Sequence, residues 1–175
     1  MRPYNRAMLA RFAAAALAFA LIAAAAPPTA GQNSPRGGEA SSVPRYVSLR
    51  SDEVNLRTGP GARYPVDWVF KRKNLPVEVL AEFEHWRKIR DVDGTEGWVH
   101  QSMLSSRRYA VVIGETRTLR RQAEASAPSV ARVERGVLGQ IVECQDRWCR
   151  LDVGGFKGWL PRSEIWGVYP NETLK

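Results

Sequence analysis

The sequence predicts an all-β protein built from two tandem small β-barrels, and an internal repeat is the main reason. The two copies of this repeat are WRKI at 86–89 with GWV at 97–99, and WCRL at 148–151 with GWL at 158–160. Short stretches of alternating apolar and polar residues surround both copies, and Gly, Pro, Asn and Asp separate them. This spacing is typical of short strands in a barrel or rolled sheet, not of a helical domain. A repeat of this length implies two modules, each with its own core.

The N-terminal segment has the features of an export signal, and we expect residues 1–30 to be a signal peptide. Arg2, Arg6 and Arg11 give it a positive start, and two prolines follow the apolar run 12–26. That run has about 15 residues, whereas a membrane-spanning helix needs about 20. We therefore expect a mature form without a transmembrane span and a periplasmic or secreted location. An uncleaved membrane anchor is the alternative.

Residues 31–44 are expected to form a flexible linker, because they are rich in Gly, Ser, Pro and Gln and contain no aromatic residue. The chain has a formal net charge of +8. In the cytoplasm this charge would suggest nucleic acid as a partner. For an exported protein the available acidic partners are envelope polymers and lipid head groups, so no nucleic-acid partner is expected. A charge that only maintains solubility is the simpler interpretation.

The first module is expected over residues 45–105. Its strand candidates, followed by one helical turn at 101–105, are 46–49, 53–57, 66–71, 75–81, 86–91 and 97–100. Gly59-Pro60-Gly61 is a strong turn signal, because Gly permits positive φ and Pro fixes its own φ. Asp93-Gly94 signals a tight hairpin.

The second module is expected over residues 106–168, and residues 169–175 are expected to be a loosely held tail. The strand candidates of this module are 110–113, 116–120, 129–134, 139–144, 148–153 and 158–160. The join at 105–108 is short, so we expect the two modules to touch. Such a contact would help two domains that are each too small to bury a deep core.

The two cysteines, Cys144 and Cys149, are expected to form a disulfide. In an oxidising compartment an even pair is more often a disulfide than two free thiols. If 145–148 is a hairpin turn, the two side chains face each other, and so short a loop makes the bond a local clamp. A redox couple and a metal site are the alternatives. His85 and His100 lie in the other module and the spacing matches no usual zinc pattern, so no metal and no cofactor is expected.

The first module resembles the bacterial SH3-like domain family. The matching residues are NLRTGPG at 55–61, Tyr64-Pro65, Trp86 and Gly97-Trp98-Val99. The resemblance covers 46–104 with specific motifs, and over 109–165 it is good in the second half and weak in the first. It implies a small, strongly bent β-barrel with an extracytoplasmic binding role toward cell-wall material or other envelope proteins.

The resemblance also implies a shallow groove lined by loop aromatics beside the Gly-Pro-Gly segment. Carried over to this sequence, it gives Tyr64 and Trp68 as ligand-binding residues, with Arg57 and Arg63 at the rim. Flat aromatic faces with polar edges suit peptides or sugars, and Arg pairs with carboxylates. The alternative is that these aromatic rings only pack. The second module lacks the Gly-Pro-Gly turn and the Tyr, so the groove is not carried over there.

No catalytic residue is predicted. A cysteine nucleophile would need a free thiol and a His base, and the sequence has no Gly-rich phosphate loop and no Gly-x-Ser-x-Gly elbow. We therefore expect a non-catalytic exported binding protein of the bacterial cell envelope that recognises peptide or cell-wall material. The alternative is a protein–protein adaptor or structural partner of another envelope protein, without polymer binding. No oligomeric state is predicted.

Overall fold

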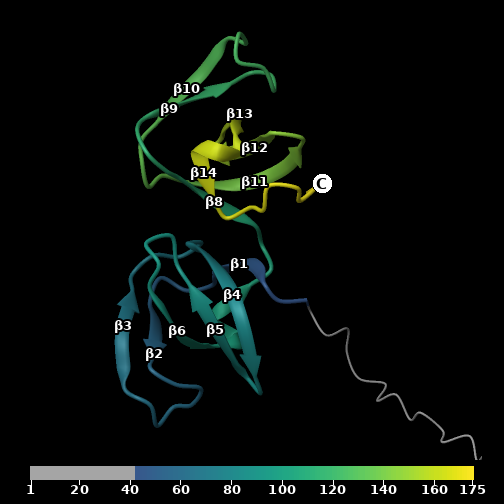
Figure 1. The fold of residues 1–175 in the computed structure, drawn as a ribbon. Helices are drawn as coiled ribbons and strands as arrows, with labels where there is room; N and C mark the ends of the chain where they lie inside the picture. Colours follow the sequence, from purple (N-terminus) through teal and green to yellow (C-terminus); the bar gives the residue numbers. More distant parts are fainter. Residues whose placement is uncertain (1–41) are drawn as a thin grey trace, which may run out of the picture. The chain divides into compact units, whose positions relative to one another are not determined.

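The computed structural model describes residues 42–175 (Figure 1). The predicted signal peptide and residues 31–41 of the predicted linker lie outside this range. Every regular element from residue 42 onward is a β-strand or a single 3₁₀ turn, so the all-β prediction is confirmed. In the same range, no helix has the length and apolar character needed to cross a membrane.

The first barrel is one antiparallel sheet in the order β3-β2-β6-β5-β4-β1-β7. Its elements are β1 (Arg45–Leu49), β2 (Val54–Arg57), β3 (Val66–Phe70), β4 (Pro76–Phe83), β5 (Trp86–Arg90), β6 (Glu96–His100), η1 (Gln101–Met103) and β7 (Leu104–Ser105). The helical turn predicted at 101–105 is observed as the 3₁₀ turn η1.

The second barrel repeats this topology strand for strand, in the order β10-β9-β13-β12-β11-β8-β14. Its elements are β8 (Tyr109–Val112), β9 (Arg117–Arg120), β10 (Ser129–Val133), β11 (Leu138–Gln145), β12 (Trp148–Val153), β13 (Phe156–Pro161), η2 (Arg162–Glu164) and β14 (Ile165–Trp166). The duplicated barrel predicted from the Trp and Gly repeat is thus confirmed.

Each barrel has a separate hydrophobic core. The first is centred on Leu49, Val54, Leu56, Phe70, Val77, Val79, Ile89, Val99 and Leu104. The second is centred on Ala110, Val112, Leu119, Val133, Ile141, Cys144, Cys149, Leu151, Leu160 and Ile165. The apolar residues of the repeated motif, Ile89 and Val99 in one copy and Leu151 and Leu160 in the other, are fully buried. They alternate with more exposed neighbours, as one-sided burial of a strand requires.

The repeated Gly-Trp step has a packing reason. A Cβ placed on Gly97 would lie 2.6 Å from Leu56 Cγ and 2.9 Å from the carbonyl oxygen of Arg57. A Cβ on Gly158 would lie 3.0 Å from the carbonyl oxygen of Arg120. In both barrels the glycine lets β2 or β9 approach the neighbouring strand closely, which is the usual role of Gly inside a strand.

The β11–β12 hairpin carries the predicted disulfide. Cys144 and Cys149 are paired across the two strands and are joined by an S–S bond. The last pair before the turn is Gln145 with Trp148, so the turn is slightly tighter than the four-residue turn expected. Both sulfurs belong to the second core, and the bond closes the hairpin that forms one wall of it.

The C-terminal residues 169–175 are anchored, which corrects the prediction of a loosely held tail. The Leu174 N–H donates to the carbonyl of Cys144 at 3.4 Å, and the Cys144 N–H donates back at 2.9 Å. Arg162 Nη2 donates to the carbonyl of Glu172 at 2.6 Å. These contacts are polar and join distant parts of the chain, so apolar periodicity gives no sign of them.

The two barrels belong to one compact unit and contact each other, as the short join predicted. The Tyr46 ring packs edge-on against Trp166 at 4.9 Å between centroids and lies 4.7 Å from the Tyr169 ring. The Tyr169 hydroxyl donates to Glu78 Oε1 at 2.8 Å, and Arg90 donates to the other oxygen of Glu78 at 2.5 Å. Glu78 is only 5% exposed, so these partners satisfy a carboxylate that would otherwise be costly to bury.

Arg108, in the join, completes this contact, which we call the junction cluster (Tyr46, Glu78, Arg90, Arg108, Trp166, Tyr169, Glu172). Its guanidinium lies 5.9 Å from the centre of the Tyr46 ring and forms a two-pronged pair with Glu172, with one N–O distance of 2.9 Å. Burial opposes ionisation of Glu172, but the hydrogen bonds from Arg108 and from the Tyr169 N–H outweigh it, so its pKa is lowered. The pairing therefore holds at neutral pH.

Candidate binding site

Three of the four predicted groove residues meet in the loop between β2 and β3. The Tyr64 ring covers Gly59 so closely that a Cβ there would lie 2.4 Å from Tyr64 Cδ1. Arg57 Nη1 donates to the carbonyl of Tyr64 at 2.7 Å. The Arg63 guanidinium lies 5.3 Å from the centre of the Tyr64 ring. The Gly-Pro-Gly loop is therefore closed by the Tyr64 ring and tied to β2 by Arg57.

The equivalent loop of the second barrel has the same backbone anchor without the aromatic ring. Arg120 Nη1 donates to the carbonyl of Ala127 at 2.9 Å, as Arg57 does to Tyr64. Ala127 is 5% exposed, so it closes the loop and offers no ring to a ligand. The two loops therefore differ in the side chain at this position but share the hydrogen bond that anchors the loop backbone.

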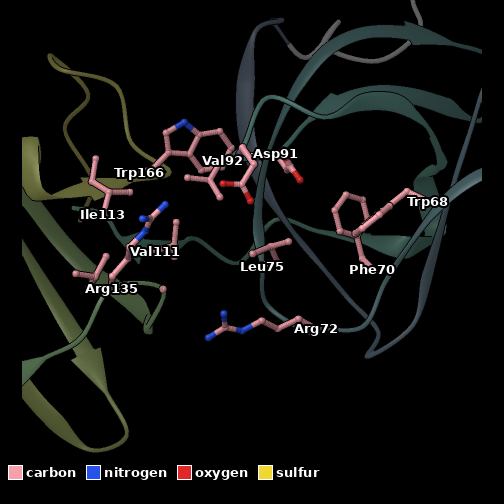
Figure 2. Close-up of a pocket in the computed structure, with 13 residues that line it drawn as sticks. Trp68, Phe70, Arg72, Leu75, Asp91, Val92, Val111, Ile113, Arg135 and Trp166 are labelled. Carbon is pink, nitrogen blue, oxygen red and sulfur yellow. Dashed lines mark hydrogen bonds between the residues drawn. The ribbon is translucent and has the colours of Figure 1, made fainter. Parts of the chain in front are cut away.

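Trp68, the fourth predicted residue, lies in a different environment. It is on β3, is 56% exposed, and lines a cleft of about 550 Å³ that we call the Trp68 cleft (Figure 2). The lining of the cleft includes Trp68, Phe70 and Arg72 of the first barrel and Ile113, Arg135 and Trp166 of the second. Arg57 instead lines a smaller depression with Trp86 and His100. The structure therefore does not place the four residues in one groove.

Arg72 and Arg135 are the cationic side chains of the Trp68 cleft. Each follows the third strand of its barrel, after β3 and after β10, so the two arginines occupy equivalent positions of the repeat. Neither guanidinium has a hydrogen bond or ion pair within residues 42–175. Because guanidinium groups pair readily with planar carboxylates, this cleft offers two anion-binding groups as well as an exposed indole.

Two aspartates, Asp91 and Asp93, also line this cleft, and the Asp91 carboxylate is already engaged. Asp91 Oδ1 accepts hydrogen bonds from the Asp93 N–H at 3.0 Å and from the Thr95 N–H at 2.8 Å. Together with the Asp91 N–H, which donates to the carbonyl of Thr95 at 3.0 Å, these bonds close a short loop over 91–95 between the paired strands β5 and β6. Gly94 has a φ of 89° there, so the tight hairpin predicted at Asp93-Gly94 is confirmed. The hydrogen bonds accepted by the Asp91 side chain, which the sequence did not predict, stabilise this turn.

The histidines serve the 3₁₀ turn η1. His100 Nδ1 lies 2.7 Å from Ser102 Oγ and accepts from the Ser102 N–H at 3.3 Å, so His100 caps the turn. His85 Nδ1 lies 3.1 Å from Gln101 Nε2. Within the described part of the chain, no three His, Cys, Asp or Glu residues are grouped as a metal site would require.

Sequence reasoning missed the Trp68 cleft because its walls come from strands and loops far apart in the chain. The available signal was the basic run Lys71-Arg72-Lys73, which is rich in charge but gives no indication of what it faces. Arg135 has no basic residue directly next to it in the sequence. Only its position in the repeat, two residues after the third strand, relates it to Arg72.

Comparison with known proteins identifies the domains. The model of the bacterial SH3 domain family matches residues 50–106 and 114–167. Similar solved structures include NlpC1 from Trichomonas vaginalis, at 11% identity and a TM-score of 0.34, covering 73% of this chain and 47% of that one. NlpC2 from the same organism has 11% identity and a TM-score of 0.35, covering 74% and 50%.

A third similar structure is an NlpC/P60 family protein from Bacillus cereus ATCC 10987, at 12% identity and a TM-score of 0.32, covering 69% of this chain and 55% of that one. The chain thus spans about half the length of these three proteins. No curated protein matches it. Because the two segments matched by the family model cover most of the chain and coincide with the two barrels, the chain belongs to the bacterial SH3 domain family and carries the domain twice.

Proposed function

We propose that this protein is a non-catalytic, exported binding protein of the bacterial cell envelope that recognises peptide or cell-wall material. The observation that supports this most is that the exposed indole of Trp68 lines the same cleft as the guanidinium groups of Arg72 and Arg135, which are unpaired in the described part of the chain. An aromatic face gives large contact area at low entropic cost, and guanidinium groups bind a carboxylate with directional hydrogen bonds. A peptide with a free carboxylate offers both kinds of partner.

The dimensions of the Trp68 cleft suit a short ligand. Its volume of about 550 Å³ lies in the range of small-molecule and short-peptide sites. In the proposed complex the ligand carboxylate lies near Arg72 and Arg135, and its apolar part lies over Trp68 and Phe70. Both barrels contribute to the cleft, so both contribute to recognition.

The proposed location outside the cytoplasm has independent support. The Cys144–Cys149 disulfide lies in the second barrel, and such bonds persist mainly in oxidising compartments. The predicted signal peptide at 1–30 agrees with this location. In that compartment, wall polymer and its peptides are accessible, and nucleic acid is not a proposed partner.

The proposal of a non-catalytic role is supported by the state of the nucleophiles. Both cysteines of the chain are consumed in the disulfide, which removes the thiolate that a cysteine hydrolase needs. The His100–Ser102 contact belongs to the cap of η1 and has no carboxylate partner within residues 42–175 to orient the ring.

Sedimentation with purified wall sacculi tests the proposal. Trp68→Ala removes the exposed anchor, and we expect a loss of about 2 kcal/mol, or roughly 30-fold in affinity, as for other aromatic anchors. The matched control is Phe156→Ala, because Phe156 is 60% exposed and lies outside the cleft. Unchanged retention of Trp68→Ala would reject the cleft. A loss in Tyr64→Ala with none in Trp68→Ala would favour the loop groove predicted from the sequence.

A protein–protein adaptor is the second candidate, and one surface favours it. Trp148, Pro161, Val168 and Pro170 line a largely apolar groove of about 520 Å³ on the second barrel. Apolar grooves of this kind suit protein partners. Retention on sacculi through guanidinium groups falls as salt rises, whereas binding through an apolar groove persists. Retention that survives high salt, needs an added envelope protein and is lost in Trp148→Ala would establish the adaptor.

A further inference from the structure

A small pocket lined by basic residues lies where the end of β1, the β3–β4 loop and the join between the barrels meet. We call it the basic pocket; it has a volume of about 350 Å³, and the residues that line it are Arg50, Lys73, Asn74, Ser105 and Arg107. None of these lines the Trp68 cleft, so the two sites are distinct although Arg72 and Lys73 are neighbours in sequence.

The backbone fixes the segments that carry these charges. The Asn74 N–H donates to the carbonyl of Leu49 at 2.9 Å, which ties the β3–β4 loop to the residue just before Arg50. The buried Ser48 hydroxyl donates to the carbonyl of Arg107 at 2.8 Å, which ties the join to β1. The convergence of the three cations is therefore a property of the fold, not a chance arrangement of long side chains.

The charges of the basic pocket are uncompensated. Arg50, Lys73 and Arg107 make no side-chain hydrogen bond or ion pair within residues 42–175, and no carboxylate is among the described residues that line the pocket. Three like charges around one small space repel each other, and this repulsion is relieved when an anion enters. By contrast, Lys71, two residues before Lys73, is paired with Glu53.

Neutral donors complete the lining. Ser105 Oγ accepts a hydrogen bond from the Arg107 N–H at 3.2 Å, so its own proton remains available to a ligand. The Asn74 side-chain amide has no partner within the described range and can also donate. A ligand in this space would thus meet donors from several directions.

We infer that the basic pocket binds a phosphate-type oxyanion. A tetrahedral oxyanion accepts hydrogen bonds all around its surface, which matches convergent Arg, Lys, amide and hydroxyl donors. Lys binds such a group as a point charge, and Arg binds it with two parallel donors. The phosphate belongs either to an anionic lipid head group or to a soluble or polymer-borne phosphate.

Thermal unfolding of the purified full chain tests this inference, with inorganic phosphate as the probe and chloride of equal ionic strength as the reference. We expect phosphate to raise the unfolding midpoint in a saturable way that yields a Kd. Lys73→Gln and Arg107→Gln are each expected to weaken this Kd about tenfold, the effect of losing one charge-assisted hydrogen bond. The matched control is Arg121→Gln, which removes one exposed, unpaired charge outside the pocket and should leave the Kd unchanged.

The reference measurement excludes misfolding as an explanation. Because Lys73→Gln relieves repulsion, this variant should unfold in chloride at the same temperature as the parent or a higher one. No difference between phosphate and chloride in the parent, or an equal phosphate effect in Lys73→Gln, would overturn the inference.

Sedimentation with vesicles of equal parts phosphatidylcholine and phosphatidylglycerol then separates the two possible sources of the phosphate group. Vesicle binding lost in Lys73→Gln indicates a lipid head group, and no vesicle binding beside an intact phosphate effect indicates a soluble or polymer-borne phosphate.

Discussion

The glycine of the repeated Gly-Trp step is the sharpest test of how this sequence specifies its barrel. Gly97→Ala places a methyl group 2.6 Å from Leu56 Cγ, about 1 Å short of the roughly 3.5–4.0 Å optimum for two carbons. Leu56 is fully buried in the first core and cannot turn away. The same methyl group would lie 2.9 Å from the carbonyl oxygen of Arg57, so the backbone of β2 must move as well.

The expected cost follows from these contacts. Overpacking of this kind costs about 1–3 kcal/mol, and the reduced entropy of the unfolded chain returns about 0.4–1 kcal/mol. We therefore expect Gly97→Ala to lower the free energy of unfolding by about 1–2 kcal/mol. Gly158→Ala should have a similar effect in the second barrel, because its methyl group would meet the Leu119 Cβ and the Arg120 carbonyl at 3.0 Å.

Urea unfolding followed by Trp fluorescence measures this effect, with the midpoint shifted and the slope retained. Gly61→Ala is the control, since the nearest atom to its new methyl group is 3.3 Å away in the side chain of Tyr64, which can give way. We expect this control to change stability by less than about 0.5 kcal/mol, within the range of ordinary surface substitutions. Equal stability of Gly97→Ala and Gly61→Ala would refute the packing explanation of the repeat.

Two further predictions concern the junction cluster and the disulfide. Burial and then the negative charge of Glu78 raise the pKa of Tyr46 to about 12 from its ordinary value near 10, so the stability that its neutral form provides is complete below pH 10 and is lost as pH rises through 12. Burial and the hydrogen bond to Glu78 also raise the pKa of Tyr169, so spectrophotometric titration should show a late tyrosinate component that shrinks in Tyr46→Phe. A titration without any late component would contradict the buried junction. Reduction of the Cys144–Cys149 bond opens a loop of sequence separation 5, which corresponds to about 2 kcal/mol in the chain-entropy model. Urea unfolding with and without reductant should show this loss, and a loss above about 4 kcal/mol would mean that the bond is more than a local clamp.

The sequence predicted the fold well because the fold depends on local rules. Turn residues divided the chain, alternation placed Ile89 and Val99 inside, and the repeat carried the same assignment to the second barrel. The strand β12 lies at the predicted residues, and β13 begins at Phe156, two residues before the predicted start. Short-range periodicity determines these features, so one sequence contains enough information for them.

The sequence predicted the binding surface only in part, because surfaces depend on distant contacts. Tyr64, Arg57 and Arg63 are close in sequence, and the structure brings them together. Trp68 is equally close, yet it lies in a cleft whose other wall includes Arg135. No periodicity relates residues so far apart, and one sequence without its structure gives no measure of which loops face each other.

The two barrels differ in which contacts their equivalent positions make. The second barrel lacks the aromatic ring of the first loop, since Ala127 stands at the position of Tyr64, but it keeps the arginine anchor that shapes the loop. Residues at the end of its sheet and beyond it contact the first barrel: Trp166 packs on Tyr46, and Tyr169 donates to Glu78. Because the walls of the Trp68 cleft come from both barrels, a single barrel would present an open aromatic surface and only one of the two guanidinium groups. The duplication therefore supports the proposed function through the cleft that the two barrels form together, not through two equal sites.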